Sequence, residues 1–200
     1  GYRPPWGILT GVRPAKIASE LIRYGYTPDA AAKRISEKYL TTPRKASLAV
    51  TVSRAEDRLI RPELRRTCSV YIGIPFCPSR CSYCSFVSYT SPKLLSLIPD
   101  YLTALRTNIH TVFETIRELG LKLSTVYIGG GTPTVLNESQ LQFLLDAVTQ
   151  ETDVSRLEEF TLEAGRPDTI TKEKLLIAKN MGVSRISVNT QTLNDDILAS

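Results

Sequence analysis

Three cysteines within eight residues are the part of this sequence with the clearest chemical potential. Cys77, Cys81 and Cys84 form a C-x3-C-x2-C run, and the fourth cysteine, Cys68, lies nine residues before it. Thiolates are soft ligands that suit zinc and iron–sulfur clusters, and a cubane cluster ordinarily takes four of them. Three ligands on one short loop therefore predict a metal centre with one open position, where a substrate or cofactor can bind.

A fourth protein ligand is not evident. A structural zinc site needs a further Cys or His, and the only histidine, His110, lies off the apolar stripe of an expected helix, where we expect it to be solvated. Cys68 precedes the first expected strand, at the opposite end from the cysteine run, so we expect a small buried residue there. Zinc or a plain thiol cluster is the alternative to an iron–sulfur centre. A disulfide framework is not expected, because the chain shows no secretory signal.

Short β-branched runs alternating with amphipathic helices predict the scaffold that would hold the cysteines. The strands are expected at 69–74, 124–129, 158–164 and 184–189. The helices between them are expected to begin at Pro99 and Asp100, at Asn137 with Gln140 completing a capping box, and at Thr171. Strands and helices at this spacing imply right-handed crossovers and a parallel sheet, which is an α/β architecture.

The carboxyl ends of the expected strands collect the unusual residues. Cys77 follows the first strand, the turn GGGTPT (129–134) follows the second, Glu163 closes the third, and Asn189 to Gln191 close the fourth. Ligands bind at the carboxyl ends of parallel strands, and glycines let a backbone approach a ligand closely. The sequence therefore predicts a binding site along one edge of the sheet.

The first third of the chain has a different character. Residues 1–66 carry fourteen Lys and Arg against six acidic residues, whereas 67–200 carry eleven against fourteen. Helical spacing of apolar residues predicts two or three short helices at 13–60, with Trp6 packed on them. The cluster Arg58–Arg66 could face an anionic partner or be a solvated helix face and linker, and the lack of interleaved aromatic residues argues against nucleic acid. We expect a basic helical segment at 1–66 and a core at 67–200.

Composition and the two ends set broad limits. The chain is 42% hydrophobic and 22% charged, which is typical of a globular protein. No apolar stretch is long enough to span a membrane, and GYRPPWGILTG lacks the layout of a signal peptide, so we expect a soluble cytoplasmic protein. The chain starts without Met and stops at LNDDILAS, where a helix begins. We therefore expect the core to continue beyond residue 200.

These motifs resemble the radical S-adenosylmethionine (SAM) enzymes. The C-x3-C-x2-C run after a first strand, with Tyr83 before its last cysteine, is typical of that family. YIGIPFCPSRCSYCSF, GGGTPT and RISVNTQTLND are similar to the oxygen-independent coproporphyrinogen III oxidase (dehydrogenase) branch, over about residues 69–200. PWGILTGVRP and EAGRPDTI resemble a longer variant of it. The resemblance implies a partial radical SAM (β/α) barrel with four of six strands.

The resemblance also implies a cofactor site. Cys77, Cys81 and Cys84 would ligate three irons of a [4Fe–4S] cluster, whose fourth iron would be chelated by the amino and carboxylate groups of SAM. The residues implied to contact or surround SAM are Tyr71, Tyr83, Gly130, Gly131, Thr132, Glu163 and, at a second SAM, Gln191. Tyr71 and Gln191 could instead be packing or turn residues. No side chain is assigned as a catalytic residue.

The implied reaction is the oxidative decarboxylation of coproporphyrinogen III to protoporphyrinogen IX in haem biosynthesis. A protein such as flavodoxin or ferredoxin would supply electrons, and the basic cluster would suit a tetracarboxylate porphyrinogen. Two departures matter. Gly73 stands where the family has histidine, and Ser85 and Phe86 follow Cys84 where the oxidases carry a further cysteine. The second feature is closer to a group of haem-binding chaperones. A haem chaperone and a radical SAM methyltransferase are therefore the alternatives.

Overall fold

The chain divides into two compact units, Gly1–Arg65 and Arg66–Ser200. The computed structural model describes residues 4–9, 13–59 and 66–198. Most of the Arg58–Arg66 cluster, residues 60–65, lies outside these ranges, so its predicted role stays a prediction. Within the described ranges, no helix is long and apolar enough to cross a membrane.

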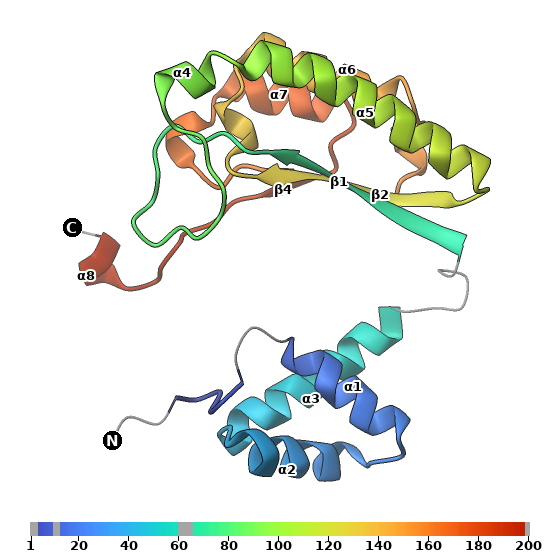
Figure 1. The fold of residues 1–200 in the computed structure, drawn as a ribbon, viewed down its shortest axis with the longest axis vertical. Helices are drawn as coiled ribbons and strands as arrows, with labels where there is room; N and C mark the ends of the chain where they lie inside the picture. Colours follow the sequence, from blue (N-terminus) through green and yellow to red (C-terminus); the bar gives the residue numbers. More distant parts are fainter. Residues whose placement is uncertain (1–3, 10–12, 60–65, 199–200) are drawn as a thin grey trace. The chain divides into compact units, whose positions relative to one another are not determined.

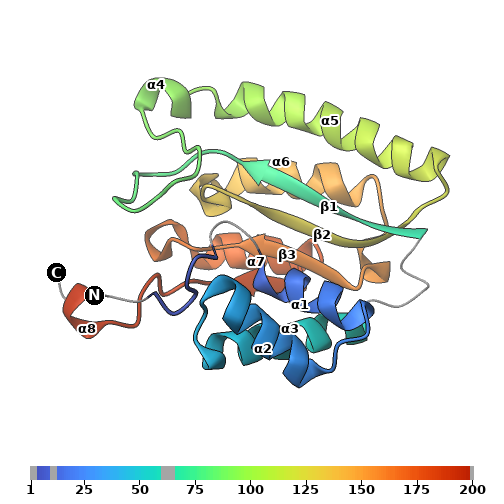
Figure 2. The ribbon, with the colours of Figure 1, turned by 60° about the horizontal axis from the view of Figure 1, so that its bottom comes forward.

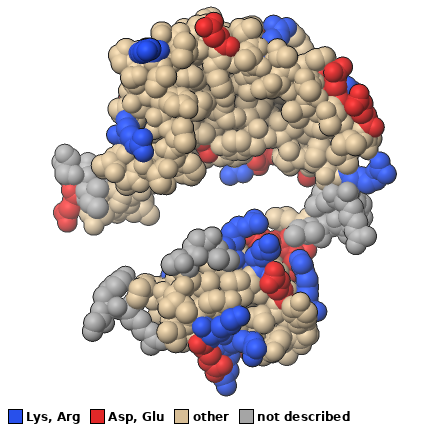
Figure 3. Space-filling model, viewed as in Figure 1, with Lys and Arg blue, Asp and Glu red and all other residues tan. Residues whose placement is uncertain are grey.

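The described residues of the first unit form three helices, as the apolar spacing predicts: α1 (Pro14–Arg23), α2 (Pro28–Tyr39) and α3 (Pro43–Leu59) (Figure 1). Each begins with proline, which suits the first helical position because its missing N–H would have no partner there. A small core of Ala18, Ala31, Ile35, Ala46, Ala49 and Val50 joins the helices, and Trp6 packs against it as expected. Many Lys and Arg side chains lie on the visible face of this unit (Figure 3).

The second unit is built on a four-stranded parallel sheet, which confirms the predicted α/β architecture. Its strands are β1 (Thr67–Ile74), β2 (Lys122–Gly130), β3 (Glu159–Glu163) and β4 (Arg185–Ser187), in that order across the sheet. Ile74 pairs with Gly130, and Glu163 pairs with Ser187, so the carboxyl ends of the strands meet at one edge. The fourth strand is shorter than the predicted 184–189.

Helices α5 (Ile98–Glu118), α6 (Glu138–Thr149) and α7 (Lys172–Asn180) cover one face of this sheet (Figures 1 and 2). Val70, Ile72 and Ile74 alternate along β1 toward that face and join the main core. The other face of the sheet carries Tyr71 and Tyr127, and among the described residues of this unit no helix covers it. The short helices α4 (Pro92–Leu95) and α8 (Asp195–Leu198) and the turns η2 (Pro133–Val135), η3 (Val154–Arg156) and η4 (Pro167–Thr169) complete the unit.

Side-chain caps define the first residues of α6 and α7, the helices that follow the turns after β2 and β3. The predicted capping box of α6 is confirmed: Asn137 Oδ1 accepts from the Gln140 N–H at 2.9 Å, and Gln140 Oε1 accepts from the Asn137 N–H at 3.0 Å. Thr171 caps α7 by accepting from the Lys174 N–H at 3.2 Å. Each such cap contributes about 1 kcal/mol, which fixes where the preceding turn ends.

The structure corrects the expectation about Cys68 and adds contacts to the one about His110. Cys68 lies inside β1, paired with Leu123, and it is half-buried rather than fully buried before the strand. Its place at the end of β1 remote from Cys77 is as predicted, and burial raises the pKa of its thiol. His110 is exposed, which confirms the predicted solvated position, and it also contacts Glu151 and Glu114.

Candidate functional site

A pocket of about 320 Å³ opens at the carboxyl ends of the strands. Its lining contains all ten residues that the sequence singled out, which come from four separate stretches of chain. They are Tyr71, Cys77, Cys81, Tyr83, Cys84, Gly130, Gly131, Thr132, Glu163 and Gln191. The structure thus brings the candidate residues to one cavity, while the role of each stays a prediction.

The cysteines lie on the long loop between β1 and α4, and the base of this loop is closed by the backbone. The Tyr89 N–H donates to the Pro75 carbonyl at 2.8 Å, and the Cys77 N–H donates to the Tyr89 carbonyl at 3.1 Å. Phe76 is buried beside this closure with its ring against Tyr101, in an edge-on contact at 5.3 Å between ring centroids. The loop therefore leaves the core at a fixed point, immediately before Cys77.

The three thiols are free, and all three cysteines line the pocket. Cys77 is buried and accepts a hydrogen bond from Thr132 Oγ1 at 3.3 Å, while Cys81 Sγ lies 3.7 Å from Arg166 Nη1. Cys84 closes a turn by donating its N–H to the Cys81 carbonyl at 3.1 Å. In the described ranges, no three His, Cys, Asp or Glu side chains are yet arranged around a common metal position.

The donor set fits an iron–sulfur cluster with an open position. Three free thiols face one cavity, and thiolates are the ligands that such clusters take. Neither Cys68 nor His110 belongs to the pocket lining, so the pocket offers no further cysteine or histidine. The cavity also holds a carboxylate and backbone groups next to the thiols, as a bound cofactor with polar groups requires.

The glycine turn after β2 is pressed against the cysteine loop, and this contact explains its composition. A Cβ at Gly131 would lie 2.7 Å from the Phe76 carbonyl oxygen and 2.8 Å from Cys77 Sγ. Gly130 has a φ of +116°, a backbone conformation that residues with a side chain rarely adopt, and a Cβ there would lie 2.9 Å from the backbone of Ile74. The Thr132 N–H donates to the Phe76 carbonyl at 2.8 Å. The turn can therefore lie against the loop only because these positions lack side chains.

Glu163 is held at the end of β3 by two donors. Tyr127 Oη donates to Glu163 Oε1 at 2.5 Å, and the Gly130 N–H donates to Oε2 at 3.2 Å. Burial, together with the hydrogen bond to Glu163, raises the pKa of Tyr127 to about 12, so its hydroxyl remains a donor across the neutral range. The Tyr71 ring stacks on Tyr127 with centroids 5.5 Å apart. The carboxylate is thus fixed in direction, with lone pairs left for a ligand.

Tyr83 and Gln191 connect the two outermost parts of the pocket. Tyr83 Oη donates to Gln191 Oε1 at 2.9 Å, which joins the cysteine loop to the segment after β4. Gln191 has a φ of +62°, a strained conformation for a residue other than glycine. Backbone strain of this kind persists where the surroundings enforce it, and it is common at ligand sites.

Two residues that matter here were not singled out from the sequence. Tyr127 alternates with the buried Val126 and Ile128, which places it on the same face of the sheet as Tyr71, and this alternation is visible in the sequence. Arg166 follows Glu163 by three residues, so the rule that ligands bind at the carboxyl ends of strands would have placed it in the pocket lining as well.

Comparisons with known proteins find a matching family model and related sequences. A family model described as the radical SAM superfamily matches residues 71–200. The oxygen-independent coproporphyrinogen-III oxidase-like protein HemZ of Bacillus subtilis (strain 168) is 34% identical over 202 aligned residues, which cover 99% of this chain and 40% of HemZ. The heme chaperone HemW of the same organism is 42% identical over 132 residues, which cover 65% of this chain and 33% of HemW.

A solved structure gives the same result at the level of the fold. The radical SAM enzyme coproporphyrinogen III oxidase (HemN) from Escherichia coli is 26% identical, with a TM-score of 0.56 over 74% of this chain and 33% of HemN. The chain therefore spans between a third and two fifths of the length of these relatives. The four-stranded sheet corresponds to the partial barrel that the sequence predicted, and the family implies a [4Fe–4S] cluster and SAM as cofactors.

Proposed function

This chain belongs to the radical SAM superfamily, and from that premise we propose that its protein decarboxylates coproporphyrinogen III oxidatively to protoporphyrinogen IX. The observation that carries the proposal is the extent of similarity to HemZ, an oxidase-like protein, which covers 99% of the chain and so includes the helical first unit. The similarity to HemW covers only 65%. Because the chain spans 40% of HemZ, the activity is proposed for the longer protein.

In this proposal Cys77, Cys81 and Cys84 hold the cluster and leave one iron for SAM. Thr132 Oγ1 orients the buried Cys77 sulfur, and the Phe76 contacts fix the start of the loop. When bound, the cluster and SAM supply a one-electron cleavage of SAM and, through it, hydrogen-atom abstraction from a substrate propionate. The proposal includes a cytoplasmic location and an electron donor such as flavodoxin or ferredoxin.

The remaining pocket residues would bind and orient SAM. Glu163, fixed by Tyr127, accepts hydrogen bonds from the SAM amino group, and the backbone of Gly130 and Gly131 lets that group approach. The backbone of Tyr83 would meet the adenine of SAM and Gln191 would contact a second SAM, and the hydrogen bond between them keeps both side chains in place. Charge-assisted hydrogen bonds contribute about 1.5 to 3 kcal/mol each, so Glu163→Gln should weaken SAM binding at least tenfold.

The test uses the full-length protein, reconstituted with iron and sulfide without oxygen. After reduction with dithionite in the presence of SAM, 5′-deoxyadenosine and protoporphyrinogen are measured with and without coproporphyrinogen III. We expect deoxyadenosine that rises with the porphyrinogen, and little of it in Glu163→Gln. A loaded protein that makes deoxyadenosine but no protoporphyrinogen would exclude the oxidase, and a labelled methyl group moving from SAM to a substrate would identify a methyltransferase.

A haem chaperone is the second candidate, and a specific observation favours it. The core is 42% identical to the heme chaperone HemW, and Ser85 and Phe86 follow Cys84 without a further cysteine. A chaperone should bind haem at one equivalent per chain in an absorbance titration and pass it to an acceptor. Absence of stoichiometric binding, together with product formation from coproporphyrinogen III, would remove this candidate.

A further inference from the structure

Arg166 reaches from the turn after β3 to the cysteine loop, 85 residues earlier in the chain. Its Nη2 donates to Ser79 Oγ at 3.1 Å, and its Nη1 lies 3.5 Å from the Ser79 carbonyl oxygen and 3.7 Å from Cys81 Sγ. The side chain is only 24% exposed. It is therefore a mostly enclosed cation with donors directed at the middle of the cysteine loop.

The guanidinium is itself held by a second set of contacts. Asp168 accepts from Arg166 Nε at 3.2 Å and from Nη2 at 3.1 Å, a two-point contact that fixes the plane of the group. Since the Asp168 side chain is 56% exposed, this pair orients Arg166 more than it stabilises the fold. The arginine fork is needed here because one side chain must serve Asp168, Ser79 and Cys81 at once.

The turn that carries Arg166 is anchored to Lys174, a buried residue in the first turn of α7. Thr169 Oγ1 donates to the Arg166 carbonyl at 2.7 Å. Lys174, which is 8% exposed, donates from Nζ to the carbonyls of Thr169 at 2.9 Å and of Thr134 at 2.8 Å. Lys174 therefore ties the turn after β3 to the glycine turn after β2, and Arg166 extends this connection to the cysteine loop.

We propose that Arg166 is a positioning residue that clamps the cysteine loop and, through its contact with Cys81 Sγ, raises the reduction potential of a cluster bound there. A nearby positive charge and an N–H···S hydrogen bond both favour the reduced, more negative state of an iron–sulfur cluster. The inference rests on the proposed cluster but not on the proposed substrate. It concerns how readily the cluster takes its electron.

The experiment compares Arg166→Gln and Arg166→Lys with the unaltered full-length protein. In cluster-free protein, hydrogen exchange followed by mass spectrometry reports the opening of residues 79–84 without any cofactor. In reconstituted protein, a redox titration followed by electron paramagnetic resonance gives the cluster midpoint potential. Arg117→Gln is the matched control, because Arg117 also pairs with a carboxylate but does not line the pocket. Its Nη1 lies 3.1 Å from Glu151 Oε2.

We expect Arg166→Gln to speed exchange in residues 79–84 about fivefold, which corresponds to the loss of one typical hydrogen bond, and to shift the potential to a more negative value. Arg166→Lys keeps the positive charge but loses the planar guanidinium. The cluster potential should therefore stay close to that of the unaltered protein, while hydrogen exchange in residues 79–84 should be as fast as in Arg166→Gln. Unchanged exchange in Arg166→Gln, or the same change in Arg117→Gln, would overturn the clamp. An unchanged potential in Arg166→Gln would overturn the effect on the cluster.

The two readouts also separate this inference from the proposed function. If the unaltered protein loads no cluster, the proposed function fails, and hydrogen exchange still tests the clamp. If the cluster loads and coproporphyrinogen III is converted while exchange and potential do not respond to Arg166, the proposed function stands and this inference fails.

Discussion

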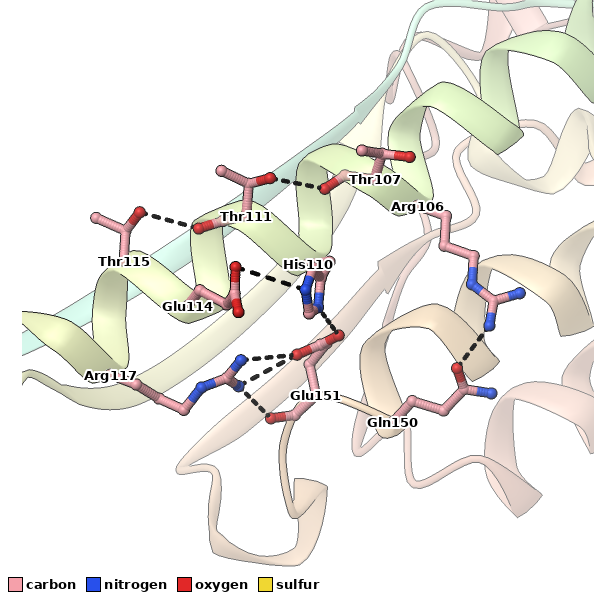
Figure 4. A network of polar contacts seen from close by, with 9 residues as sticks. All are labelled: Arg106, Thr107, His110, Thr111, Glu114, Thr115, Arg117, Gln150 and Glu151. Carbon is pink, nitrogen blue, oxygen red and sulfur yellow. Dashed lines mark hydrogen bonds and ion pairs between the residues drawn. The ribbon is translucent and has the colours of Figure 1, made fainter.

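The two ends of the parallel sheet both gather polar side chains, but they use them differently. At the carboxyl ends of the strands, thiols, Glu163 and glycine backbone surround a pocket of about 320 Å³. Near the amino ends of β2 and β3, where α5 and α6 finish, Glu151 is the centre of a charged network drawn in Figure 4. The polar groups at the carboxyl ends surround an open pocket. We call the second group the closed cluster, because its members His110, Glu114, Arg117 and Glu151 contact one another.

In the closed cluster the partners satisfy one another. Glu151 accepts from Arg117 Nη1 at 3.1 Å and Nη2 at 3.2 Å, and its Oε1 lies 2.7 Å from His110 Nδ1. Arg106 donates to Gln150 at 2.8 Å beside them. These lone pairs of Glu151 are used within the protein and are not available to a ligand. The charged cluster therefore has a structural role, which is to hold α5 against the end of α6. Donors and acceptors converge on an unfilled cavity only at the carboxyl ends of the strands, among these two clusters, so that end is the candidate ligand site.

The cysteines provide the largest expected contrast between the two ends, because Cys77 lies in the pocket and Cys68 at the opposite end of β1. We expect Cys77→Ala to reduce the iron and sulfide bound per chain after reconstitution at least tenfold, since three thiolates leave no spare ligand. Cys68→Ala should load as the unaltered protein does. Equal loss in both variants would mean that the cluster does not depend on the pocket.

Two glycines of the pocket lining give the next contrast, because only one of them touches the cysteine loop. A Cβ at Gly131 would lie within 2.8 Å of the Phe76 backbone and Cys77 Sγ, whereas a Cβ at Gly165 would meet nothing within 4 Å. Gly131→Ala should lower the free energy of unfolding by about 1 to 3 kcal/mol, and Gly165→Ala should change it by less than about 1 kcal/mol. Urea unfolding of both variants measures the difference.

A result in the other direction would be equally informative. If Gly131→Ala unfolds at the same urea concentration as the unaltered protein, the glycine turn and the cysteine loop are not in contact in solution. Iron loading of the same variants then separates a loss of stability from a loss of the site, because Gly165→Ala lines the pocket without the steric conflict.

The elements of this fold were predictable because their signals are local. The capping box at Asn137 and the β-branched runs need only nearby residues, and the carboxyl-end rule then brought the glycine turn, Glu163 and Gln191 to one pocket. Recognition of the cysteine run as a cluster motif came from resemblance rather than from spacing alone. The parallel pairing of the strands followed from the alternation of strands and helices.

Contacts between residues that lie far apart in the chain could not be predicted from the sequence. The solvated position of His110 was predicted, but nothing near it in the chain indicates its contact with Glu151, which lies 41 residues later. The contact of Arg166 with Ser79 joins residues 87 apart. The start of β1 depended on its pairing with β2, which extends to Thr67 and so includes Cys68. Such pairings are set by tertiary packing, which periodicity does not encode.

The smallest effect concerns the closed cluster and its dependence on pH. The hydrogen bond to Glu151, followed by the charge of Glu114, raises the pKa of His110 above its ordinary value of 6.5. Burial raises the pKa of Glu151, but the hydrogen bonds from His110 and Arg117 outweigh it and lower that pKa overall. The His110 contribution to stability is therefore fully present below pH 6.5 and is lost as pH rises through the raised pKa. The Glu151 contribution is lost as pH falls through its lowered pKa.

His110 is the only histidine of this chain, so an NMR titration of the 200-residue chain follows a single imidazole. We expect its pKa to lie above 6.5, to fall toward 6.5 in Glu151→Gln, and to rise further in Arg117→Gln, because the Arg117 charge lowers it. The opposite signs separate the network from a general loosening of α5, which would move both variants toward 6.5. A pKa of 6.5 in the unaltered chain would show that His110 does not contact Glu151 in solution, and that this contact does not join α5 to the end of α6.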